Sequence, residues 1–153
     1  MQDTKTSVSD AAAQMYKNMK MGESAILDLM PKVHSETLRG DMVAHLEGYQ
    51  SFAERAKALL DAEHKEAKDA NLFAKASSKM GIAMNTMMDS TASHIAEMLI
   101  EGSTMGITDQ MRIIHELERT GENGDRQMEE TLCLAKEIVS FEEKNVEKMK
   151  EYL

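Results

Sequence analysis

Apolar side chains recur at alternating three- and four-residue steps along most of this 153-residue chain. That spacing is typical of an α-helix that buries one face against other helices. The stretch from Leu72 to Glu101 is the longest example, with apolar positions running from Phe73 to Met98. Two polar residues, Thr91 and His94, lie on the same stripe. The spacing therefore predicts an all-α protein whose other helices pack around this one.

Breaks in the pattern divide the chain into helices. Pro31 stops the first helix, because the residue before a proline is pushed out of the α region. The segment TGENGD at residues 120–125 is the clearest loop. Gly102 and Gly106 predict a second break, and one kinked, continuous helix is the alternative. We predict helices over residues 8–30, 36–66, 72–101, 104–119 and 125–151. Short connections make neighbouring helices antiparallel. The expected fold is an up-down four-helix bundle in one domain, residues 1–153, with a short extra helix or kinked segment after Gly102.

Composition excludes several classes of partner. The net charge of −9 argues against nucleic acid and against an anionic membrane surface, since both need clustered Lys and Arg. No segment approaches about 18 uninterrupted apolar residues, and the first residues lack the pattern of a signal peptide. The single cysteine, Cys133, cannot form an internal disulfide. We expect a cytoplasmic protein that binds neither nucleic acid nor a membrane.

Two helices carry a charged or titratable residue on an otherwise apolar seam. In residues 36–66, His45 takes a heptad position between Met42 and Tyr49. In residues 125–151, Glu142 is the one charged member of the seam, and we interpret it as leaning out beside that seam. Polar residues at such positions are the best sequence clue to chemistry in this chain.

Four residues are candidates for a metal site. In an up-down bundle, Glu23, His45 and His94 fall in one layer near the same end, and Glu97 shares a helix face with His94. Carboxylates and imidazoles that project inward from several helices hold metals in bundles. Iron, manganese and zinc are the candidates, and the sequence equally allows no metal. The structural alternative is that His45 and His94 are core histidines, each hydrogen-bonded to a neighbouring Tyr, Thr or Glu.

These features resemble a known superfamily. Long antiparallel helices with inward Glu and His resemble the ferritin-like four-helix bundles, and HIAEMLIEGSTMG at residues 94–106 resembles small uncharacterised bacterial members. The resemblance implies a ferritin-like bundle with a site between its helices. The di-iron members carry Glu-x-x-His on two helices. This sequence has only the reverse arrangement, His94-x-x-Glu97.

Methionine is unusually frequent, with 15 residues. Thioethers near His94 could hold Cu(I), but methionine more often fills irregular core space. There is no Gly-rich phosphate loop, CxxC, HExxH or GxSxG, so the sequence leaves open whether the protein is an enzyme.

Two functions remain. One is a bundle that binds a metal through Glu23, His45, His94 and Glu97. The other is a non-enzymatic structural or protein-interaction bundle that forms a homodimer or another homo-oligomer. A metal site requires His45 and His94 to face each other, whereas a scaffold would keep them apart.

Overall fold

The computed structural model describes residues 8–62, 89–120 and 125–153. Over these ranges the chain is helical and contains no strand. Its elements are α1 (Val8–Leu29), the 3-10 turn η1 (Met30–Lys32), α2 (Glu36–Ala62), α4 (Ala92–Thr120) and α5 (Arg126–Lys150). The all-α helical bundle predicted from the apolar spacing is confirmed.

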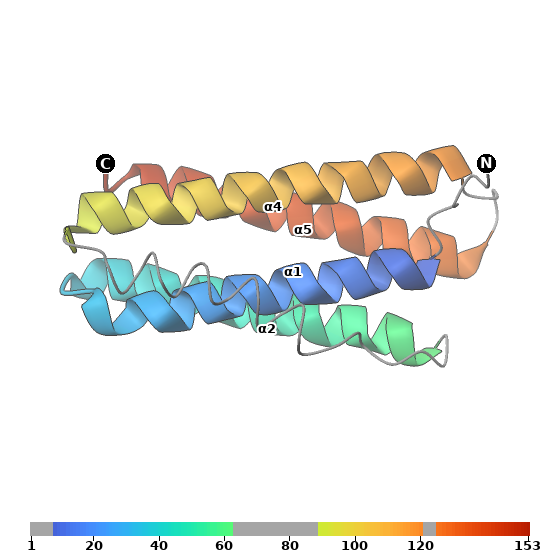
Figure 1. Ribbon diagram of the computed structural model, residues 1–153, viewed down its shortest axis with the longest axis horizontal. Coiled ribbons are helices and arrows are strands. Elements are labelled where there is room, and N and C mark those ends of the chain that lie inside the picture. The colour runs from blue at the N-terminus through green and yellow to red at the C-terminus, as the bar shows by residue number, and fades with distance from the viewer. Residues whose placement is uncertain (1–7, 63–88, 121–124) are drawn as a thin grey trace.

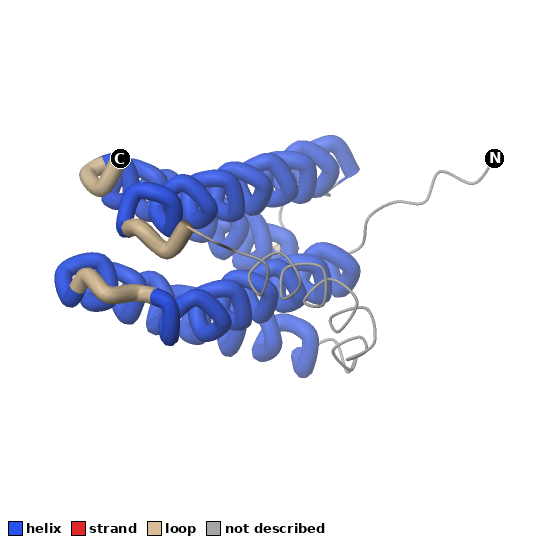
Figure 2. The backbone as a smooth tube through the Cα atoms, turned by 60° about the vertical axis from the view of Figure 1, so that its left-hand side comes forward, coloured by secondary structure: helices blue, strands red, loops and turns tan. Residues whose placement is uncertain are grey.

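The four helices form two antiparallel hairpins that lie along each other, α1 with α2 and α4 with α5 (Figure 1). A second view shows the same two pairs, with the turn between α1 and α2 and the start of α4 at one end of the bundle (Figure 2). Contacts are dense within each hairpin and sparser between the hairpins. The junction between the two hairpins is therefore the less extensively packed part of the core.

The direction of α4 differs from the prediction. The colours of Figure 1 show α2 and α4 running the same way along the bundle, whereas a simple up-down order would make them antiparallel. The reason is where α4 begins. Residues 89–91 are not helical and α4 starts at Ala92, so α2 and α4 are not joined by the short connection that forces an antiparallel neighbour. Residues 72–88 of the predicted helix lie outside the described residues.

The predicted break at Gly102 is wrong, because α4 is continuous from Ala92 to Thr120. Thr104 and Thr108 do not start a new helix. Their hydroxyls donate to the carbonyls of Ile100 (2.7 Å) and Thr104 (3.1 Å), one turn earlier in the same helix. The buried stripe runs through this region without interruption: Ile95, Ala96, Ser103, Gln110, Ile113, Ile114 and Leu117. Burial of that stripe outweighs a glycine penalty of about 1 kcal/mol per residue.

Three polar side chains fix the starts of the helices. Ser35 Oγ accepts from the Leu38 N–H (3.2 Å) and caps the start of α2. Thr91 Oγ1 accepts from the His94 N–H (3.2 Å) at the start of α4. Asp125 Oδ1 accepts from the Gln127 N–H (2.9 Å) at the start of α5.

The Asp125 cap carries a testable stability effect. Asp125→Ala should lower the free energy of unfolding by about 1 kcal/mol, because the Gln127 N–H at the start of α5 loses its acceptor. Urea denaturation followed by circular dichroism measures this change. Asp125→Asn retains a capping oxygen and should stay within about 0.5 kcal/mol of the parent. Equal losses in both variants would contradict a capping role.

The core is built from aliphatic side chains and methionine. The predicted seam of α1 is buried at Ala12, Met15, Met19, Ile26 and Leu29. With Met42 and Met149, these methionines fill interior space as structural side chains do. The methionines at positions 80–88 lie outside the described residues. None of the helices in the described ranges is both long enough and apolar enough to cross a membrane.

Candidate functional site

A buried carboxyl group joins the two hairpins. Glu142 of α5 is only 2% exposed, and its Oε2 accepts a hydrogen bond from the Tyr49 hydroxyl of α2 at 2.9 Å. Ser103 of α4 and Asn145 of α5 are also buried and lie beside the carboxyl. We refer to Glu142, Tyr49, Ser103 and Asn145 as the buried polar cluster. The sequence-based interpretation that Glu142 leans out of the seam is wrong.

Two glycines make room for this cluster. A Cβ at Gly22 of α1 would lie 2.5 Å from the Tyr49 ring, and a Cβ at Gly106 of α4 would lie 3.2 Å from Glu142 Oε1. Gly22, Tyr49, Glu142 and Gly106 therefore occupy one layer of the bundle, with one residue from each helix. At Gly22 the Tyr49 ring leaves no space for a Cβ, whereas at Gly106 a Cβ would require the Glu142 carboxyl to shift slightly.

Burial dominates the electrostatics of Glu142. It raises the pKa of the carboxyl from 4.5 to about 7, although the hydrogen bond from Tyr49 and the polar side chains of Ser103 and Asn145 beside the carboxyl favour the charged form. Burial and the neighbouring Glu142 also raise the pKa of Tyr49 well above 10, so this phenol stays protonated. In the described residues, no Lys, Arg or His forms an ion pair with Glu142.

A second polar level adjoins this layer. Asn18 lies one turn before Gly22 in α1, and Gln110 lies one turn after Gly106 in α4. Because α1 and α4 are antiparallel (Figure 1), both lie on the same side of the layer. Gln110 is fully buried, and neither of its amide atoms finds a hydrogen-bond partner among the described residues. Asn18 Nδ2 and Asn145 Nδ2 are also buried without a hydrogen-bond partner among the described residues. Asn145 lies beside the Glu142 carboxyl, but its Nδ2 does not meet hydrogen-bond geometry with it.

His45 is buried near this site without a metal-ligand partner. It lies one turn before Tyr49 in α2 and is 8% exposed. Burial lowers the pKa of its imidazole, and the charge of Asp41 opposes that change. The neutral form is therefore favoured in the folded protein.

The other three proposed metal ligands lie elsewhere. Glu23 pairs with Lys20 of its own helix at 2.9 Å. His94 Nδ1 lies 3.8 Å from Glu97 Oε2, so the structure brings this pair together, but the Glu97 side chain is 62% exposed. In the part of the chain that the structure describes, no group of three or more His, Cys, Asp or Glu side chains is placed to hold a metal. The residues in the described ranges do not fit the metal centre that a ferritin-like bundle implies.

The start of α4 explains the separation of His45 and His94. His94 lies in the first turn of α4, nine residues before Ser103 of the buried polar cluster, whereas His45 is four residues from Tyr49. At 1.5 Å per residue, the two histidines lie roughly 8 Å apart along the bundle axis. They also stand on α2 and α4, which are not packed closely together. The sequence-based prediction put Glu23, His45 and His94 in one layer because it took His94 to lie near the end of its helix. In the structure His94 lies at the start of α4.

Sequence reasoning missed Ser103, Gln110 and Asn145 and misread Glu142. The signal for Glu142 was its heptad position, together with Tyr49 on the seam of α2. Gly22 and Gly106 supplied a second signal, because a glycine inside a helix marks close approach by another group. For Gln110 and Asn145 we find no signal in the sequence.

Two hollows on the surface lie outside the buried polar cluster. A groove of about 400 Å³ at one end of the bundle is lined by Val33, His34, Ser35, Leu38, Asp89, Ser90, Thr91, Ala92 and Ile95. An open hollow along α5 is lined by Ser140, Glu143, Lys144, Glu147, Lys148, Lys150 and Glu151. Neither includes a residue of the cluster, so neither brings a substrate to Glu142.

Comparison with known proteins gives no assignment: no family model, no curated protein and no solved structure matches this chain.

Proposed function

We propose that this protein is a non-enzymatic helical bundle that acts through protein–protein interaction and associates with a second copy of itself. The observation that carries this proposal is the use of the interior polar groups. Tyr49 and Glu142 bond to each other between the hairpins, away from both surface hollows. Such a contact serves the packing of helices and offers no open position to a substrate.

The separation of the proposed metal ligands supports the same function. His94 and Glu97 are paired near the start of α4, and Glu23 is neutralised by Lys20. The described part of the interior holds one carboxylate, Glu142, with Asn145 three residues later. The ferritin-like di-iron proteins place several carboxylates and imidazoles in the interior through their Glu-x-x-His pairs, which is more than the single Glu142 carboxyl seen here.

The order and direction of the helices support a similarity in fold to the ferritin-like proteins. Ferritin-like bundles consist of two hairpins joined by one long crossover. Here α2 ends at the opposite end of the bundle from the start of α4 (Figure 1). We propose that the chain has a ferritin-like arrangement of helices without the metal chemistry of the superfamily.

Exposed apolar side chains give self-association a surface. Leu27 of α1 is 49% exposed and Val43 of α2 is 41% exposed. The contact of Gly22 with Tyr49 sets the register of this hairpin, and that register places Leu27 and Val43 at the same height on adjacent helices. Exposed apolar side chains at one height on neighbouring helices offer contact points to a second copy of the chain.

Sedimentation equilibrium over a hundredfold range of protein concentration tests the proposal. We expect a dimer that dissociates on dilution, and we expect the double variant Leu27→Glu/Val43→Glu to be monomeric over the same range. Met105→Glu, on the other hairpin, is the control and should remain dimeric. A monomer at every concentration would contradict self-association. Near-stoichiometric iron, manganese or zinc in protein purified without chelator would favour the metal-binding function instead.

A further inference from the structure

We propose that Glu142 is a proton-binding site through which the two hairpins respond to pH: they pack closely when its carboxyl is protonated and loosen when it is ionised. This inference is independent of self-association. It rests on the position of Glu142 at the junction of the hairpins and on the groups that surround its carboxyl.

Glu142 lies at the junction of the two hairpins, so its protonation state can change how the hairpins pack. The Tyr49–Glu142 hydrogen bond links α2 of one hairpin to α5 of the other. Contacts between the hairpins are sparser than those within them, so each one contributes a larger share of the packing. Phe141, next to Glu142, packs edge-on to Tyr49 with ring centroids 5.1 Å apart. A displacement of the carboxyl would disturb this aromatic contact as well.

The neighbouring helices offer the Glu142 carboxyl hydrogen-bond donors but, among the described residues, no cation. From α2, Tyr49 is the titratable group in contact, and it stays protonated. From α4 the neighbours are Ser103 and Gly106, and from α1 the same level is occupied by Gly22, none of which titrates. An ionised carboxylate in this layer would have hydrogen-bond donors but no cation, and an uncompensated buried charge destabilises packing.

Two further titratable pairs lie near this layer without compensating its charge. His45, one turn along α2, is neutral because burial lowers its pKa, and the nearby Asp41 is another acid. Lys20 and Glu23 of α1 flank Gly22 in sequence but pair with each other. Protonation of the carboxyl itself is then the direct way to remove the charge.

Buried amides lie beside the carboxyl and on the next level of the bundle. Gln110 and the Nδ2 atoms of Asn18 and Asn145 are buried and have no partner among the described residues. These amides are neutral, so they do not compensate an ionised carboxylate in the way that a cation would.

The sign of the pH effect follows from the two states. The folded protein holds the Glu142 proton more tightly than the unfolded chain, because burial raises the carboxyl pKa from 4.5 to about 7. The stabilisation by the protonated carboxyl is therefore complete below pH 4.5 and is lost as the pH rises to about 7. His45 acts in the opposite sense, since its lowered pKa makes the fold lose stability as the pH falls below 6.5.

Comparison with Glu142→Gln isolates the carboxyl, because the contribution of His45 is common to both proteins. Glutamine imitates the protonated side chain. The ratio of the unfolding equilibrium constants, parent over variant, should rise on the order of 100-fold between pH 4.5 and pH 8. The control is Glu143→Gln, an exposed neighbour, for which the ratio should stay constant. A constant ratio for Glu142→Gln would overturn the proposal.

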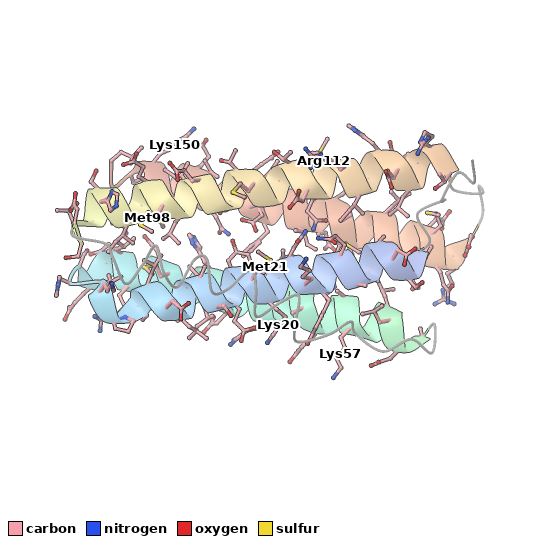
Figure 3. The ribbon with its side chains drawn as sticks, in the orientation of Figure 1. Lys20, Met21, Lys57, Met98, Arg112 and Lys150 are labelled. Atoms are coloured by element: carbon pink, nitrogen blue, oxygen red, sulfur yellow. The ribbon has the colours of Figure 1, made fainter. Side chains whose placement is uncertain are left out.

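A distance measurement tests the loosening directly. Cys133 is exposed on α5, and Lys57 projects from the outer face of α2 (Figure 3). Spin labels at Cys133 and at the cysteine introduced by Lys57→Cys report the separation of the hairpins. We expect the distance distribution to broaden between pH 5 and pH 8, and to stay narrow when Glu142→Gln is added. Equal broadening with and without that substitution would show that another group is responsible, and no broadening would show that the hairpins stay closed.

Discussion

Ile138→Ala should lower the free energy of unfolding by about 2–5 kcal/mol, one of the two largest effects expected in this protein. Ile138 is fully buried on α5, one turn before Glu142. Truncation removes its methyl and methylene groups from the core and leaves a cavity that four rigid helices can close only partly. Urea denaturation provides the measurement, with an unchanged m value showing that the loss belongs to the native state.

A graded series makes this result specific. Ile138→Val removes one methylene and should cost about 1 kcal/mol. Met105→Ala, at an exposed position of α4, should stay within about 0.5 kcal/mol of the parent. A loss below about 1 kcal/mol for Ile138→Ala would mean that the interior is packed far less tightly than described here.

The position of Ile138 also shows where a heptad reading of the sequence fails. The heptad seam of α5 alternates between Leu132, Val139 and Val146, which are half-buried, and Ala135, Glu142 and Met149, which are buried. Leu134 and Ile138 lie off that seam and are buried as well. A straight helix has 3.6 residues per turn, so a strict 3.5-residue seam drifts towards the edge of the buried face. The helices themselves are predictable from periodicity, but the orientation of each face is set by its neighbours.

The candidate site was less predictable than the fold, for a related reason. The polar positions His45 and Glu142 stand out in the sequence, but their partners depend on which helices are adjacent and where each helix begins. Moving the start of the helix to Ala92 places His94 at the end of the bundle and leaves Ser103 and Gly106 beside Glu142. No local signal marks that start strongly, since Thr91 is one of several residues able to cap a helix.

Glycine substitutions should produce effects of opposite sign at positions that look alike in the sequence. Gly40 of α2 and Gly102 of α4 have open space where a Cβ would lie, with no atom within 4 Å. Alanine at either position should stabilise the protein by about 0.5–1 kcal/mol, because it restricts the unfolded chain and favours the helix. Gly48, also in α2, faces the side of the Phe141 ring.

At Gly48 alanine should instead destabilise the protein, by about 1–3 kcal/mol. The ideal Cβ position lies 2.6 Å from Phe141 Cζ, well inside van der Waals contact. Phe141 cannot simply turn away, because it packs against both Tyr49 and Phe52, with ring centroids 5.1 and 5.2 Å from its own. Thermal or urea unfolding of the three alanine variants gives the comparison, and the gain at Gly40 and Gly102 serves as its internal control.

The outcome at Gly48 distinguishes two descriptions of the junction between the hairpins. If Phe141 is held firmly, Gly48→Ala must push α2 and α5 apart, and the Tyr49–Glu142 hydrogen bond, one residue further along each helix, should weaken with it. If Gly48→Ala stabilises the protein as Gly40→Ala does, the ring has room to move and the junction is loosely packed. A tight junction is also what the pH response of Glu142 requires, because a carboxyl can govern hairpin packing only where its neighbours cannot relax around its charge.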